Sequence, residues 1–138
     1  MVDNDARELL LEEFLHGPEA RRQYARELLN ARIALQIKTL RERKGCSQEQ
    51  LAEYAGKHQS QISQMEQVDF SGWKVSTLLK LADAFDLALV VQFEGFGKFA
   101  DEILKVDRKS LERLSYAEDP LCSSAVERVS TPSRGLPK

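Results

Sequence analysis

The sequence predicts an all-α fold with a single β-strand near its C-terminal end. Apolar residues recur at three- and four-residue spacing in several consecutive segments, as in helices that bury one face. Glycine, proline or a capping serine separates these segments. One stretch, residues 87–93, instead alternates with the two-residue period of a strand.

The first two predicted helices meet at a Gly-Pro pair. The first covers residues 5–16 and is amphipathic. Gly17 ends it, and Pro18 suits the first turn of the next helix, where its missing N–H has no intrahelical partner. The second helix is predicted to extend to about Lys44, with Gly45 after it as the C-cap residue.

Two short helices are predicted next, joined by a tight turn at Gly56. Ser47 caps the first of them, and Gln50, three residues later, completes a capping box. The second covers about residues 59–66, with Ile62 and Met65 pointing inward. Residues 69–73 form a loop in this prediction, and a further helix covers about residues 75–85.

The predicted strand has no partner of similar quality within the chain. A lone strand is not stable by itself, so we expect pairing with the same strand of a second copy across a two-fold axis. The residues expected on the paired strand are Leu87, Leu89, Val91 and Phe93. Residues 95–97 are predicted as a turn, followed by a short amphipathic helix that includes Phe96, Phe99, Ile103 and Leu104. A weaker helical pattern includes residues 111 and 114, and the polar Pro/Ser-rich end is expected to be disordered.

Composition and charge restrict the class of protein. The chain has 138 residues, of which 42% are hydrophobic, enough for one compact domain with extensions. The longest apolar run is only five residues, 87–91, and the N-terminus is acidic, so we expect no membrane span, no secretory signal and a cytoplasmic protein. Residues 31–80 hold eight basic and five acidic side chains, whereas the segments on either side are net acidic.

The second short helix is rich in amides and hydroxyls. Gln59, Ser60, Ser63 and Gln64 fall at i, i+1, i+4 and i+5, on the face opposite its apolar residues. Glutamine can both donate to and accept from adenine, and serine can pair with either kind of base edge. The alternative is a solvated helix face with no ligand.

Three runs of the sequence resemble the Cro/Xre-type helix-turn-helix family of transcriptional regulators. They are Ala34-x-x-Ile37-x-x-Leu40-Arg41-x-x-x-Gly45-x-Ser47-Gln48-Glu49-Gln50-Leu51-Ala52, Gly56-x-x-Gln59-Ser60-x-Ile62-Ser63-x-Met65-Glu66 and Thr77-Leu78-Leu79-Lys80-Leu81-Ala82-x-Ala84-Phe85. The resemblance covers about residues 31–93 and implies a five-helix repressor-like domain whose second motif helix lies in the DNA major groove. The flanking regions also resemble an antitoxin-like branch of that family.

The resemblance implies a set of DNA-contacting residues. Bases would be read by Gln59, Ser60, Ser63 and Gln64, and Gln48 would donate to a phosphate. Lys57 and His58 occupy the turn, where His58 could cap the helix or contact a phosphate. Lys74 could reach a phosphate or be only solvated. Arg41 and Glu66 are expected to form a structural ion pair.

These observations divide the chain into four regions. They are an N-terminal helical extension (1–30), the helix-turn-helix DNA-binding domain (31–86), a strand plus short helix for dimerisation (87–114) and a disordered tail (115–138). The predicted function is a homodimeric regulator, most simply a repressor, on a near-palindromic operator. The alternative is an antitoxin that binds a toxin protein and autoregulates its operon.

The sequence contains no pattern typical of an enzyme. It has no nucleophile–base pair and no phosphate-binding loop, so we expect no catalytic residues. Cys46, Cys122, His16 and His58 lack metal-ligand spacing, so no metal and no cofactor is expected. Cys46 is interpreted as a buried apolar thiol in preference to a redox sensor.

Overall fold

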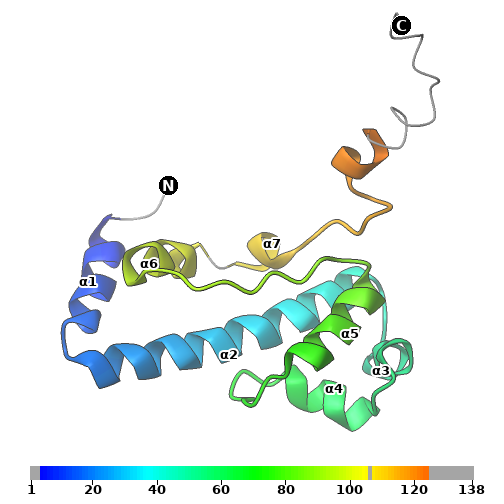
Figure 1. Ribbon diagram of the computed structural model, residues 1–138, viewed down its shortest axis with the longest axis horizontal. Coiled ribbons are helices and arrows are strands. Elements are labelled where there is room, and N and C mark those ends of the chain that lie inside the picture. The colour runs from blue at the N-terminus through cyan, green and yellow to red at the C-terminus, as the bar shows by residue number, and fades with distance from the viewer. Residues whose placement is uncertain (1–3, 106, 125–138) are drawn as a thin grey trace, which may run out of the picture.

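The computed structural model describes residues 4–105 and 107–124, and seven labelled helices lie in these ranges (Figure 1). They are α1 (Asn4–Phe14), α2 (Pro18–Arg43), α3 (Gln48–Ala55), α4 (Gln59–Met65), α5 (Val75–Phe85), α6 (Phe96–Leu104) and α7 (Arg108–Leu111). Residues 120–124 are also helical. The all-α class is confirmed, and no strand occurs in these ranges.

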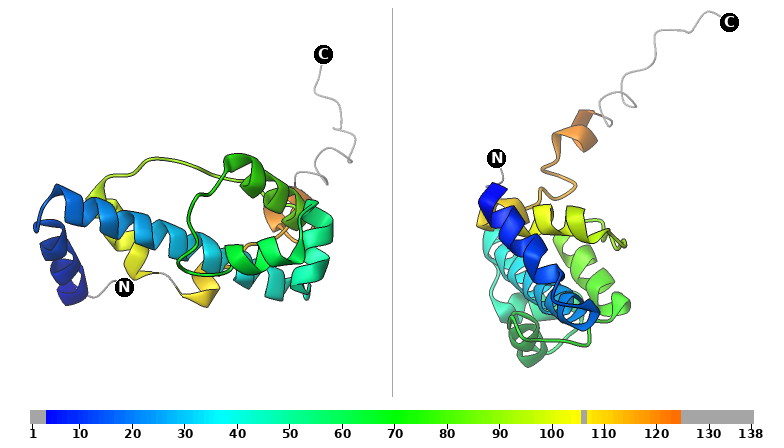
Figure 2. Two further views of the ribbon diagram at one scale, coloured as in Figure 1. Left: turned by 90° about the horizontal axis from the view of Figure 1, so that it is seen from below. Right: turned by 90° about the vertical axis from the view of Figure 1, so that its left-hand side faces the viewer.

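Helix α2 is the longest of the labelled helices, and the other helices pack along it. It has 26 residues and is therefore roughly 39 Å long at about 1.5 Å per residue. Pro18 is in its first turn, and Gly17 and Gly45 flank it with positive φ angles of 132° and 72°. Helices α1 and α6 lie at one end of α2, and α3, α4 and α5 lie at the other (Figures 1 and 2).

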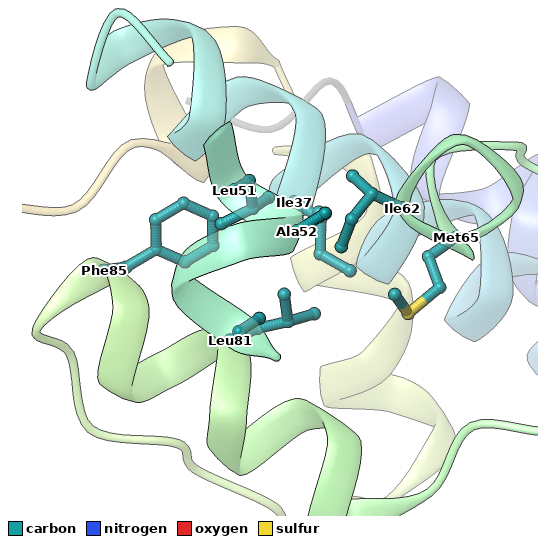
Figure 3. Packing of buried hydrophobic residues seen from close by; sticks show 8 residues of the cluster. Ile37, Leu51, Ala52, Ile62, Met65, Leu81 and Phe85 are labelled. Carbon is teal, nitrogen blue, oxygen red and sulfur yellow. The ribbon is translucent and has the colours of Figure 1, made fainter. Parts of the chain in front are cut away.

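The end of α2 that carries α3, α4 and α5 contains the main hydrophobic core. Ile37 of α2, Leu51 of α3, Ile62 of α4 and Phe85 of α5 are all buried in one cluster (Figure 3). Ile62 has 0% exposure, so the inner face of α4 is fully covered. This packing fixes α4 against the rest of the domain.

The expected five-helix domain has one helix fewer. Residues 31–86, all described, contain the C-terminal half of α2 and the helices α3, α4 and α5. The next residues of the chain do not add a helix to this core. Residues 86–95 instead run alongside α2 as an extended connection to α6 at its other end (Figures 1 and 2).

The predicted strand is absent from this single chain. Leu87 and Leu89 are half-buried, whereas Val91 and Phe93 are 69% and 104% exposed, and the segment forms no ladder. A strand requires a neighbouring backbone with free N–H and C=O groups, and the backbone groups of α2 beside it are already hydrogen-bonded within the helix. The prediction of a strand is therefore wrong for the protomer, and pairing between two copies stays a prediction.

A second hydrophobic cluster lies at the other end of α2. Leu10 and Phe14 of α1 pack against Ala100 of α6, and the Phe14 ring lies 5.8 Å from the ring of Tyr24 in α2. The N-terminal extension is thus not a separate element, because α6 returns to cover it. We call α1, α6 and the first turns of α2 the N-terminal module.

The C-terminal region is more ordered at its start than expected. We predicted a disordered tail from residue 115, but Tyr116 N donates to Asp86 O at 3.2 Å. The Arg43 guanidinium donates to Arg113 O at 2.9 Å and to a Glu118 oxygen at 3.1 Å. These bonds fasten residues 107–119, here called the strap, to the C-terminal ends of α2 and α5. Residues 125–138 of the predicted tail lie outside the described residues.

Candidate DNA interface

Helix α4 has one buried face and one polar face. Ile62 and Met65 are buried in the main core. Gln59, Ser60 and Gln64 are exposed, and Ser63 is half-buried. The four residues predicted to read bases therefore lie on the outer side of a helix whose inner side is fixed.

The preceding turn and helix cap are built locally. Gly56 ends α3 with a left-handed φ of 63°, and Lys57 N donates to Ala52 O at 2.8 Å. Ser47 and Gln50 form the predicted capping box of α3, with both hydrogen bonds present. The turn between α3 and α4 is thus fixed by α3 itself.

Gln61 has a structural role that the sequence analysis did not assign. Its side-chain Oε1 accepts from the backbone N–H of His58 at 2.9 Å, at the start of α4. The spacing in the sequence could have indicated this role, because Gln61 is the third helical residue after the N-cap residue His58, where a capping-box glutamine stands. His58 itself is exposed.

A chain of hydrogen bonds connects the outer face of α4 to the core of the domain. Gln59 Nε2 donates to Gln48 Oε1 at 2.8 Å. Gln48 Nε2 in turn lies 3.4 Å from Glu66 Oε1, at the long limit for such a bond. The orientation of the Gln59 amide is therefore linked to a buried carboxylate.

That carboxylate belongs to the predicted ion pair, which is present. Arg41 Nε and Nη2 donate to the two Glu66 oxygens at 2.8 and 2.9 Å, and Arg41 Nη1 donates to Cys46 O at 2.8 Å. The hydrogen bond to Glu66 raises the pKa of Arg41. A bidentate pair of this kind fixes the geometry of both side chains.

The hydrogen-bond donors and acceptors that remain unused on Gln59 and Gln48 define what this surface can bind. An amide has two N–H donors and an acceptor oxygen. The bond to Gln48 uses one donor of Gln59, which leaves a donor and an acceptor, the pair that adenine requires. Gln48 keeps one N–H that could donate to a phosphate.

The other two predicted phosphate contacts, Lys57 and Lys74, are not part of this hydrogen-bond network. Lys57 is half-buried in the turn, before α4. Lys74 is exposed as the N-cap residue of α5, beyond the α4–α5 loop. In that loop the rings of Phe70 and Trp73 lie 4.6 Å apart, and both pack against the main core.

The described ranges contain neither a metal cluster nor a helix that could span a membrane. No group of three or more His, Cys, Asp or Glu side chains gathers there as a metal site. No helix in the same residues has the length and apolar character of a membrane span.

Comparison with known proteins agrees with the geometry. Residues 37–91 match the family described as Helix-turn-helix, of the Cro/C1 type. No curated protein and no solved structure showed significant similarity to the chain. The match covers the residues that build the main core and α4. Residues 37–91 are therefore a Cro/C1-type helix-turn-helix domain, and the chain is a DNA-binding regulator in that general sense.

Proposed function

We propose that the protein is a homodimeric, sequence-specific transcriptional repressor that acts on DNA in the cytoplasm. The observation that carries the proposal is the outer face of α4, where Gln59, Ser60 and Gln64 are exposed on a helix with a buried inner side. Such a helix can enter the major groove without losing its packing. Repression by DNA binding needs no catalytic residue and no cofactor.

Base reading is assigned to the amides and hydroxyls of α4. The proposed residues are Gln59, Ser60, Ser63 and Gln64, and Gln48, Lys57, His58 and Lys74 would contact phosphates. Each bidentate glutamine–adenine contact would contribute roughly 1–3 kcal/mol of discrimination. Because few of these residues are charged, the affinity for non-specific DNA should be modest.

The homodimer is proposed from the segment 87–93. Its exposed Val91 and Phe93 side chains, at 69% and 104%, would be covered if two copies paired antiparallel across a two-fold axis. Two recognition helices about one DNA turn apart, roughly 34 Å, would then fit a near-palindromic operator.

Selection of bound DNA from a random pool tests the proposal, because it reports binding, symmetry and half-site spacing together. We expect a near-palindromic site with adenines in each half. Gln59→Ala with Gln64→Ala should reduce affinity for that site to the non-specific level. Gln23→Ala, which removes an exposed amide on α2, is the matched control and should change nothing. Unchanged affinity in the double variant would refute base reading by α4.

An antitoxin is the second candidate, and one observation favours it. The N-terminal module has its own hydrophobic cluster at the end of α2 away from α4, so a protein could bind there while α4 holds DNA. This candidate predicts stable co-purification with the product of a neighbouring gene and neutralisation of its toxicity. A regulator that represses its operator without any such partner would contradict it.

A further inference from the structure

The N-terminal module has an open groove on its surface, away from α3 and α4. The groove has a volume of about 470 Å³ and lies between α1 and α6. Leu9 and Leu104 line it and are 64% and 36% exposed. Leu10 and Ile103 lie beneath them, in the second hydrophobic cluster.

Leu9 and Leu104 are not among the residues of the second hydrophobic cluster. Leu10 and Phe14 fill the contact between α1 and α6, and an ion pair between Arg7 and Asp101 at 3.0 Å joins the same two helices. Leu9 lies outside that contact. Exposed apolar side chains that line one groove are a candidate binding surface, in the way that larger exposed apolar patches mark interaction sites.

The side of the groove that α1 forms is acidic. Helix α1 holds Asp5, Glu8, Glu12 and Glu13 against one arginine, which is paired with α6. Glu12 and Glu13 line the groove, and His16, 4.0 Å from Glu13, is the one basic residue type among the lining side chains. This rim repels DNA phosphates and attracts cationic groups.

We propose that this groove binds an amphipathic helix of a partner protein, with aliphatic side chains on one face flanked by lysine or arginine. The aliphatic face would lie on Leu9 and Leu104, and the cations would lie against Glu12 and Glu13. A helix that binds in a groove uses apolar anchors at i, i+3 or i+4, and i+7, and Leu9 and Leu104 give such anchors an exposed apolar surface. The complementary charge selects a basic helix over an acidic one.

The groove lies at the end of α2 away from α4, so peptide binding in the groove does not depend on base reading by α4. A regulator with this groove would hold DNA at one end and a basic protein segment at the other. Either interaction can therefore be lost without the other.

The test uses the full chain and two labelled synthetic peptides of about four helical turns each. Both carry leucines at i, i+3, i+4 and i+7 spacing, and their other positions are lysine in one and glutamate in the other. Fluorescence anisotropy should show the lysine peptide binding at least about tenfold more tightly. Leu9→Ser, and separately the pair Glu12→Lys and Glu13→Lys, should each weaken that binding at least about tenfold.

Matched controls separate the groove from general attraction. Leu121→Ser removes another exposed leucine, and Glu49→Lys with Glu53→Lys makes the same change of net charge on α3. Neither should weaken peptide binding by more than about twofold. Circular dichroism should give an unchanged melting temperature for Leu9→Ser, since that side chain is largely exposed.

Three results would overturn the proposal. One is equal binding of the two peptides, and another is equal loss in the α3 control pair. The third is self-association of the wild-type chain that Leu9→Ser abolishes in sedimentation, because the groove would then hold a second copy. Binding of selected DNA, measured in parallel, should be the same for wild type and Leu9→Ser.

Discussion

The buried pair Arg41–Glu66 allows the sharpest test of how this domain is held together. Their side chains are 13% and 3% exposed, so replacing one partner leaves the other charged and poorly solvated. Removing one partner of a buried pair costs about 3–5 kcal/mol. For Glu66→Leu we expect about 3 kcal/mol, near the lower limit, because Arg41 keeps its bond to Cys46 O and some contact with water.

The opposite single change should be more damaging. In Arg41→Met the carboxylate of Glu66 stays in the less exposed position with Gln48 as its remaining neighbour, so we expect about 4 kcal/mol. The double variant removes both charges and their desolvation cost. Its loss should therefore be only about 1 kcal/mol, far less than the singles together.

Urea denaturation, followed by circular dichroism and by the fluorescence of Trp73, measures all four proteins. The control is the exposed pair of Lys98 with Glu94, whose side chains are 65% and 34% exposed, where we expect no measurable change of the urea midpoint. A double variant that loses as much as the sum of the two singles would refute the reasoning. It would mean that the pair acts as two independent surface charges.

Three further predictions follow from the packing, the strap and the extended segment. Ile62→Ala should destabilise the domain by about 2–5 kcal/mol in urea titrations because that side chain is fully buried, and a loss below about 1 kcal/mol would contradict this packing. The hydrogen bond from Arg43 lowers the pKa of Glu118 from its ordinary value of 4.5, so its contribution to strap docking is present above that value and is lost as pH falls through the lower folded pKa. The protection of the Tyr116 amide against hydrogen exchange, relative to its intrinsic rate at each pH, should fall in that acid range, and Glu118→Gln should show the lower protection already at neutral pH. Val91→Glu should dissociate the proposed dimer in sedimentation; a dimer that stays intact would remove the segment 87–93 from the interface.

The parts of the fold that depend on neighbouring residues were predictable from the sequence. Helix ends followed from Gly17, Ser47 and Gly56, because caps and left-handed turns act within a few residues of themselves. The two faces of α4 followed from the spacing of its apolar and amide residues. The ion pair followed from family resemblance, since 25 residues separate its partners.

Long-range packing was decided only by the tertiary structure. The pattern of residues 87–93 favours a strand, but the segment must cross from α5 to α6, and α2 beside it offers no backbone partner. The packing of α6 on α1 and the hydrogen bonds from Arg43 to the strap each join residues at least 70 positions apart. Local sequence sets which conformations are favourable, whereas the partner that buries each face depends on where the whole chain places its other elements.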